Sequence, residues 1–183
     1  MIPLIIILVI VAIIVLYFIG AYNNLISLRN KVRDQWSQIE VNLKRRSDLI
    51  PNIVETVKGY AKHEKSTFED IVKARNTFES AKNPADEMKA SGEISHAVSK
   101  LFALAENYPD LKSNENFLSL QGQLKETEDK ISYARQFYND TVMMYNNKVQ
   151  MFPSNIIANI FKFKAETFFE AEEAERKNVE VKF

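Results

Sequence analysis

An uncharged apolar run near the N-terminus limits what this chain can fold into more than any other feature. Residues 2–19 read IPLIIILVIVAIIVLYFI and contain no charged side chain. At about 1.5 Å per helical residue they cover roughly 27 Å, close to the hydrocarbon thickness of a bilayer. The run therefore predicts a membrane-spanning helix, with Pro3 at its start and Tyr17 and Tyr22 at headgroup level at its far end.

A cleaved signal peptide is the alternative interpretation of the same residues. Signal peptides carry basic residues before the apolar core, and here no Lys or Arg precedes the run. Arg29, Lys31 and Arg33 instead follow it, and such a basic flank is typical of the cytoplasmic side. The sequence thus predicts a single-pass cell-membrane protein with its N-terminus outside and the remainder cytoplasmic.

Composition narrows the function classes. The chain has 183 residues, with 24 Lys and Arg against 24 Asp and Glu, no Cys and two His. A net charge of zero disfavours nucleic-acid binding, which normally needs a basic excess on one face. The absence of cysteine excludes disulfides and iron–sulfur clusters, and two histidines are too few for an imidazole-rich metal site. We therefore expect no cofactor and no nucleic-acid partner.

Apolar residues after the run recur at steps of three and four, the spacing of helices that bury one stripe. They predict a first helix that continues to about residue 60 and a second over roughly 66–83, capped by Ser66 or Thr67. A third is expected to end before Pro109, and a fourth to cover about 114–152.

The predicted fold is all-α, with the N-terminal transmembrane helix continuing into an antiparallel up-and-down four-helix bundle. Three domains follow from this pattern: an anchor over 1–21, the bundle over 22–152 and a C-terminal tail over 153–183.

Arg46 interrupts the apolar stripe of the first helix, and Glu128 interrupts that of the fourth. In an antiparallel pair of these helices the two positions lie opposite each other. We therefore predict a structural ion pair, in which the guanidinium can bind in a bidentate manner. The alternative is that Arg46 reaches the surface from the edge of the stripe.

Pro51 lies inside the first predicted helix. Proline has no N–H to donate and its ring clashes with the preceding turn, so a bend is expected between Asp48 and Pro51. In soluble bundles such a bend is more often a packing feature than a binding one.

The tail combines aromatic and basic residues. Its segment IIANIFKFKAETFF supplies four rings, Phe161, Phe163, Phe168 and Phe169. If the fourth helix returns to the bilayer, these rings reach the membrane surface, where they suit shallow insertion between headgroups. Alternatively they pack under the base of the bundle, and both interpretations stay open. The charges beyond residue 169 predict a solvated final helix.

Residue patterns for catalysis are incomplete. His63 and Glu64 begin like an HExxH zinc motif, but Thr67 stands where the second histidine belongs. Glu93 and His96 have the Glu-x-x-His spacing of di-iron bundles, which need a second copy that this chain lacks. We therefore expect a protein that is not an enzyme and has no catalytic residues.

Three blocks of sequence resemble a known family, LemA. They are YNNLISLRNKVRDQWSQIEVNLKRRSDLIPNIVETVKGYAKHE from Tyr22 to Glu64, SLQGQLKETEDKISYARQFYNDTVMMYN from Ser119 to Asn146, and FPSNIIANIFKFKAETFFEAEEAE in the tail. The resemblance implies a bacterial-type protein with one membrane helix, a cytoplasmic-side helical bundle and no established activity. Some similar proteins contribute to building magnetosome membranes, which by analogy favours a membrane-organising role.

Two functions compete. The favoured one is a membrane-anchored scaffold or adaptor that binds the lipid bilayer, other proteins or its own copies. The alternative is an enzyme or small-ligand-binding bundle at the membrane, which would need polar groups converging on a pocket. The candidates there are chiefly Arg46, Glu128 and Arg135, enough for an ion pair but a poor active site.

Overall fold

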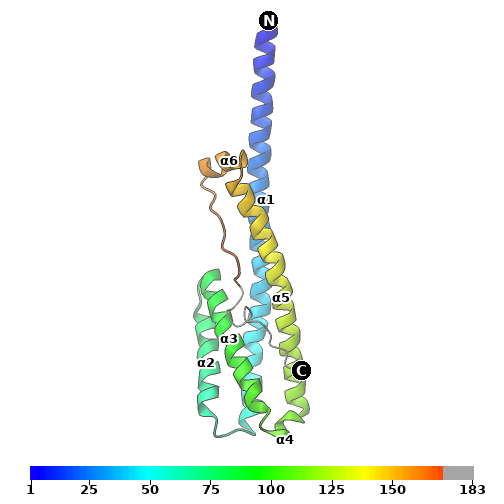
Figure 1. Ribbon diagram of the computed structural model, residues 1–183, viewed down its shortest axis with the longest axis vertical. Helices are drawn as coiled ribbons and strands as arrows, with labels where there is room; N and C mark the ends of the chain where they lie inside the picture. Colours follow the sequence, from blue (N-terminus) through cyan, green and yellow to red (C-terminus); the bar gives the residue numbers. More distant parts are fainter. Residues whose placement is uncertain (171–183) are drawn as a thin grey trace, which may run out of the picture. The chain divides into compact units, whose positions relative to one another are not determined.

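Helices make up most of residues 1–170, the part of the chain that the computed structural model describes (Figure 1). Six are present there and no strand: α1 Ile2–Lys58, α2 Lys65–Ser80, α3 Pro84–Ala105, α4 Pro109–Lys112, α5 Glu115–Gln150 and α6 Ser154–Ile160. The predicted all-α fold with a long apolar N-terminal helix is confirmed. The solvated final helix predicted beyond residue 169 falls almost wholly outside the described residues.

The chain groups into two compact units. Unit 1 consists of Met1–Ser37 and Gln136–Phe168, and unit 2 consists of Gln38–Arg135 together with Phe169 and Glu170. Helices α1 and α5 each contribute residues to both units. The division predicted from sequence, into anchor, bundle and tail, follows the membrane rather than these contacts and stays a prediction.

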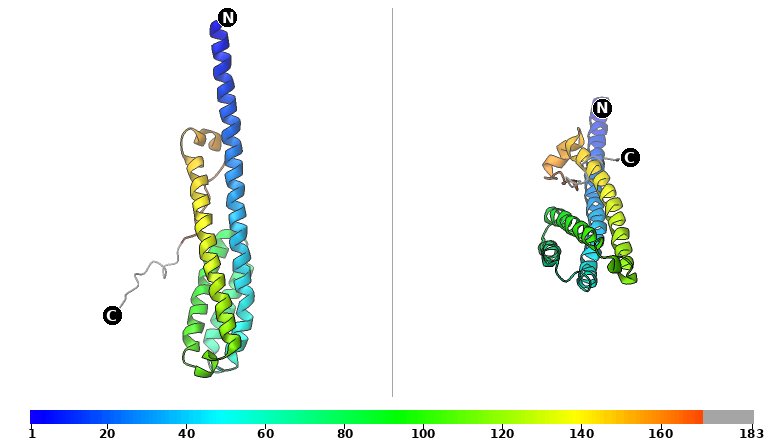
Figure 2. Two further views of the ribbon diagram at one scale, coloured as in Figure 1. Left: turned by 90° about the vertical axis from the view of Figure 1, so that its right-hand side faces the viewer. Right: turned by 60° about the horizontal axis from the view of Figure 1, so that its bottom comes forward.

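Unit 1 contains the apolar start of α1. Within residues 1–170, α1 is the one helix long and apolar enough to cross a membrane, judged by length and composition. The large apolar side chains of its first four turns are exposed on every side, a pattern that favours an apolar surrounding. Farther along, α1 packs against the second part of α5 and against α6 (Figure 2), and the buried side chains include Leu25, Val32, Val142, Tyr145 and Ile157.

The segment after α6 is tied to α5 by side-chain hydrogen bonds. Asn146 is buried, its Nδ2 donates to the Glu166 carbonyl at 2.9 Å, and its Oδ1 accepts from the Glu166 N–H at 2.8 Å. The Tyr138 hydroxyl donates to the Thr167 carbonyl at 2.9 Å. Because an extended segment has no helical partners for its backbone, these bonds satisfy groups that would otherwise be unpaired.

Unit 2 contains the second part of α1, the helices α2, α3 and α4, and the first part of α5. Its core is aliphatic and recurs at helical spacing, with Ile39, Leu43, Ile50, Ile53, Ile71, Ile94, Leu101, Leu124 and Ile131 buried. The predicted up-and-down four-helix arrangement stays a prediction, since the described helices also include α4 and α6.

The prediction that Ser66 or Thr67 caps the second helix is wrong. Helix α2 already begins at Lys65, and its N-cap residue is Glu64, which makes no side-chain cap bond. A tight turn, in which the Glu64 N–H donates to the Ala61 carbonyl at 3.2 Å, brings the chain directly into the helix. Helix α3 has the expected signature instead, because the Asn83 side chain accepts from the Asp86 N–H at 3.0 Å.

Candidate functional site

The Arg46 side chain lies inside unit 2, with 1% of its surface exposed. Its Nη1 donates to Glu128 Oε1 on α5 at 2.7 Å and to Ser95 Oγ on α3 at 3.0 Å. Its Nη2 donates to the Ser91 hydroxyl at 2.7 Å and to the Ser91 carbonyl at 3.0 Å. A single guanidinium therefore joins α1, α3 and α5.

The structure brings Arg46 and Glu128 together, but the guanidinium fork divides between two helices. One side binds the carboxylate, and the other is taken by Ser91, whose position in the sequence gave no signal of this role. The Glu128 side chain is 39% exposed, so its carboxylate keeps part of its hydration. Desolvation falls mainly on Arg46, and the oxygens of Ser91, Ser95 and Glu128 replace the water it has lost.

A second cation, Arg75, supplies a hydrogen bond that is lost because Pro51 lies within α1. Because proline has no N–H, the carbonyl four residues earlier, that of Ser47, loses its helical donor. Arg75 on α2 supplies one, since its Nε donates to the Ser47 carbonyl at 3.3 Å while its Nη2 pairs with Glu79 at 2.6 Å. The proline thus creates an acceptor through which α2 is fastened to α1.

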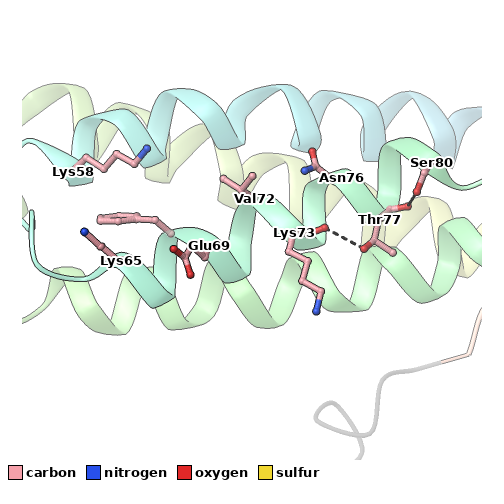
Figure 3. Close-up of a pocket in the computed structure, with 9 residues that line it drawn as sticks. Lys58, Lys65, Glu69, Val72, Lys73, Asn76, Thr77 and Ser80 are labelled. Carbon is pink, nitrogen blue, oxygen red and sulfur yellow. Dashed lines mark hydrogen bonds between the residues drawn. The ribbon is translucent and has the colours of Figure 1, made fainter.

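An open groove of about 660 Å³ lies between the end of α1 and α2 (Figure 3). We call it the basic groove. Nine residues line it, Lys58, Lys65, Phe68, Glu69, Val72, Lys73, Asn76, Thr77 and Ser80. Among the described residues none of its three lysines forms an ion pair, and Lys58 Nζ lies 5.8 Å from the centre of the Phe68 ring. The groove therefore combines the apolar side chains of Phe68 and Val72 with a net positive charge, because its lysines outnumber its one carboxylate, that of Glu69.

A groove of opposite charge lies on the other side of α2. Its volume is about 650 Å³, and its lining includes Glu40, Glu79 and Glu87. Burial raises the pKa of Glu87, and the neighbouring Glu40 carboxylate raises it further. Within residues 1–170, however, no group of three or more His, Cys, Asp or Glu is placed to hold a metal ion. His63 and His96 are exposed, the former in the turn after α1 and the latter on α3.

Three of the residues predicted at the membrane interface form one aromatic cluster in unit 1. The Tyr22 ring lies 4.6 Å from the ring of Phe161 and 5.9 Å from that of Phe163, measured between centres. Phe163 is buried, with the Arg29 guanidinium 5.2 Å from its centre, whereas Phe161 stays half exposed. Phe163 therefore packs against α1 within unit 1, whereas Phe161 keeps an outward side.

The other three candidates lie apart from this cluster. Tyr17 is exposed on the apolar part of α1, and Phe168 is 43% exposed at the end of unit 1. Phe169 is buried in unit 2, where the Arg135 guanidinium lies 4.5 Å from its ring centre. The aromatic composition of the tail did not reveal which rings face outward, because α6 and the segment after it are too short to show a period.

Comparisons with known proteins agree on one family. The sequence profile of the LemA family matches residues 35–183. The chain is 24% identical to "Protein LemA" of Metamycoplasma hominis over 164 residues, which cover 89% of this chain and 75% of the relative. It is also 25% identical to "Magnetosome protein MamQ 2" of Paramagnetospirillum magneticum, over 84% of this chain and 66% of the relative. None of these names describes an enzymatic activity.

Proposed function

The chain belongs to the LemA family, and we propose that it is a membrane-anchored helical scaffold or adaptor that holds an acidic partner protein beside the bilayer. Continuity of α1 carries this proposal. The helix is unbroken from Ile2 to Lys58, so one element contains both the candidate membrane span and, in its last turn, a lysine of the basic groove.

The distribution of polar groups supports binding rather than catalysis. The buried cation of unit 2, Arg46, directs its hydrogen bonds to neighbouring helices, and half-buried Arg75 is bound to Ser47 and Glu79. The lysines of the basic groove lie on an open surface, where they can attract carboxylates and raise the rate of encounter. The apolar side chains beside them offer area for a partner's side chains.

The relatives add an analogy to this reasoning. Some of them are named as magnetosome proteins, and the chain spans about two thirds of their length. A role in organising a membrane is therefore proposed on likeness alone. We further propose that the N-terminus is outside and unit 2 cytoplasmic, because Arg29, Lys31 and Arg33 follow the apolar run.

The experiment compares what full-length tagged protein captures from crosslinked membranes. Lys58→Glu with Lys65→Glu reverses two charges of the basic groove. Lys82→Glu with Lys112→Glu makes the same change at exposed lysines of unit 2 outside the groove. We expect the groove variant to lose partner bands that the control variant retains. Identical bands from both variants would contradict the groove as the binding surface. A fragment of residues 1–34 is the second control. If the full-length protein captures no bands beyond those captured by this fragment, the scaffold role is contradicted.

A further inference from the structure

Helix α6 and the turn before it leave a set of large apolar side chains exposed. Five residues, which we call the α6 face, range from 48% exposed at Phe161 to 79% exposed at Phe152: Met151, Phe152, Ile156, Ile160 and Phe161. Ile156 and Ile160 are four residues apart within α6, so they share one side of that helix. A soluble surface seldom keeps so many apolar groups together without a partner.

The opposite side of α6 is firmly packed. Ile157 is 1% exposed and Ala158 is fully buried. The helix ends in a Schellman cap, in which Lys162 has φ 57, the Phe163 N–H donates to the Ala158 carbonyl at 2.9 Å and the Lys162 N–H donates to Asn159 at 3.2 Å. A fixed helix, held at both its buried side and its end, thus presents the α6 face.

The level of the α6 face along α1 is set by ring contacts within unit 1. The Phe161 ring lies 6.2 Å from that of Phe18 and 4.6 Å from that of Tyr22. The uncharged apolar run ends at Ile19, between these two contacts. The α6 face therefore lies beside α1 where its apolar surface ends, which is the depth of the bilayer–water boundary if α1 spans a membrane.

We propose that the α6 face inserts into the interfacial layer of the same bilayer that α1 crosses. This inference rests on the membrane anchor of the proposed function and adds a second lipid contact to it. Lipid is the occupant that the surroundings favour, because the α6 face continues the exposed apolar surface of the span. Lys162 and Lys164 are exposed next to it, where their amino groups can reach lipid phosphates.

The contact has a mechanical consequence for unit 1. A single spanning helix is free to rotate about its own axis, since lipid surrounds it equally on all sides. An inserted helix to one side of it removes that freedom and limits tilt. Unit 1 would then meet the membrane with one defined face.

The natural absence of cysteine makes a direct test possible. Full-length variants with one cysteine each are labelled with an environment-sensitive fluorophore and placed in vesicles of phosphatidylcholine and phosphatidylglycerol, with or without brominated acyl chains. Ile156→Cys reports on the α6 face. Leu16→Cys reports on the span, and Met144→Cys is a similarly exposed apolar position on α5 in the same unit.

We expect brominated lipid to quench the probes at positions 16 and 156 and to leave the probe at position 144 unchanged. Quenching at 16 without quenching at 156 would overturn the α6 contact and leave the anchor intact. No quenching at either position would reject the anchor itself. A probe at 156 that is unquenched but shows energy transfer between labelled copies would replace lipid with a second copy.

A further variant guards against a result produced by the label. Phe152→Glu with Ile160→Glu places two carboxylates on the exposed side of the segment, where neither side chain supports the core. We expect the probe at 156 to lose its quenching in this background while helical circular dichroism is unchanged. Retained quenching would contradict insertion through the α6 face.

Discussion

Unit 2 buries a guanidinium, that of Arg46, whereas unit 1 leaves the five large apolar side chains of the α6 face exposed. In unit 2 the two terminal nitrogens of the buried cation are matched by oxygens from two other helices. Unit 1 joins an extended segment to α5 through Asn146 and Tyr138, and its apolar surface has no match among its own residues. The difference indicates that the first turns of α1 and the α6 face in unit 1 suit an apolar surrounding, whereas unit 2 pairs its buried charge within itself.

The largest effect is expected at Arg46. Arg46→Ala removes a fully buried side chain and leaves a cavity among α1, α3 and α5, so we expect unit 2 to lose about 3–5 kcal/mol. Arg46→Met fills the same space without charge and should lie within about 1 kcal/mol of the natural protein, because half-exposed Glu128 can hydrate. Hydrogen exchange of the α3 amides measures both values.

The two substitutions at Arg46 separate volume from charge. If Met and Ala destabilise unit 2 equally, the guanidinium bonds rather than the filled space hold the helices together. Amides in unit 1, such as those beside Asn146, serve as the internal control and should exchange as before. A matching change there would show that the two units do not unfold independently.

Asn146 is the corresponding test in unit 1. Asn146→Ala leaves the N–H and the carbonyl of Glu166 without their partners, which we expect to cost about 1–3 kcal/mol in that segment. Asn147→Ala, one exposed position along, is the matched control and should change little. Exchange of the Glu166 amide reports the result, and equal behaviour of the two variants would show that the clamp contributes nothing.

The stability of unit 1 is expected to depend on pH through Tyr138. Burial, with a smaller contribution from the Glu166 carboxylate, raises the pKa of Tyr138 to about 12. Since an unfolded tyrosine ionises near about pH 10, the folded protein keeps this proton over an interval in which the unfolded chain loses it. The stabilisation is therefore complete below the unfolded pKa and declines as the pH rises toward the folded one.

Tyr138→Phe should remove that decline. The ionised phenol cannot donate to the Thr167 carbonyl, so the loss is expected in the segment after α6 and not in unit 2. Hydrogen exchange is too fast at such pH, and limited proteolysis of the segment is the suitable measurement. If the stability of the segment still declines at alkaline pH in Tyr138→Phe, the decline belongs to another group. Tyr145 is one such group, because burial also raises its pKa.

The sequence predicted the long helices well because a hydrophobic period can be recognised over many residues even where single positions depart from it. The apolar run of α1 and the stripe of α5 are long enough for a period to be read, and opposed interruptions sufficed to pair Arg46 with Glu128. The contacts of Ser91 and Ser95 could not be read in the same way, although the two serines are four residues apart on α3. Their role depends on how that shorter helix is turned toward α1, which no pattern in its own residues determines.

Short segments were missed for a related reason. Helices α4 and α6 have 4 and 7 residues, too few to show a hydrophobic period. Asn146 resembles any polar residue on a helix surface, because its partners are backbone groups of a segment distant in sequence. In the tail, composition showed a segment rich in aromatic residues but could not assign Phe163 to the interior and Phe152 to the surface.

The smallest effect concerns the proline of α1. Arg75→Lys keeps a cation near Glu79 but lacks the Nε that donates to the Ser47 carbonyl, so we expect a loss of about 0.5–1.5 kcal/mol in unit 2. In a Pro51→Ala background the restored N–H serves that carbonyl, and Arg75→Lys should then have almost no effect. The measurement is a double-mutant cycle followed by exchange of the α2 amides. Additive losses would show that Arg75 acts through Glu79 alone, and that unit 2 tolerates Pro51 without any compensating donor.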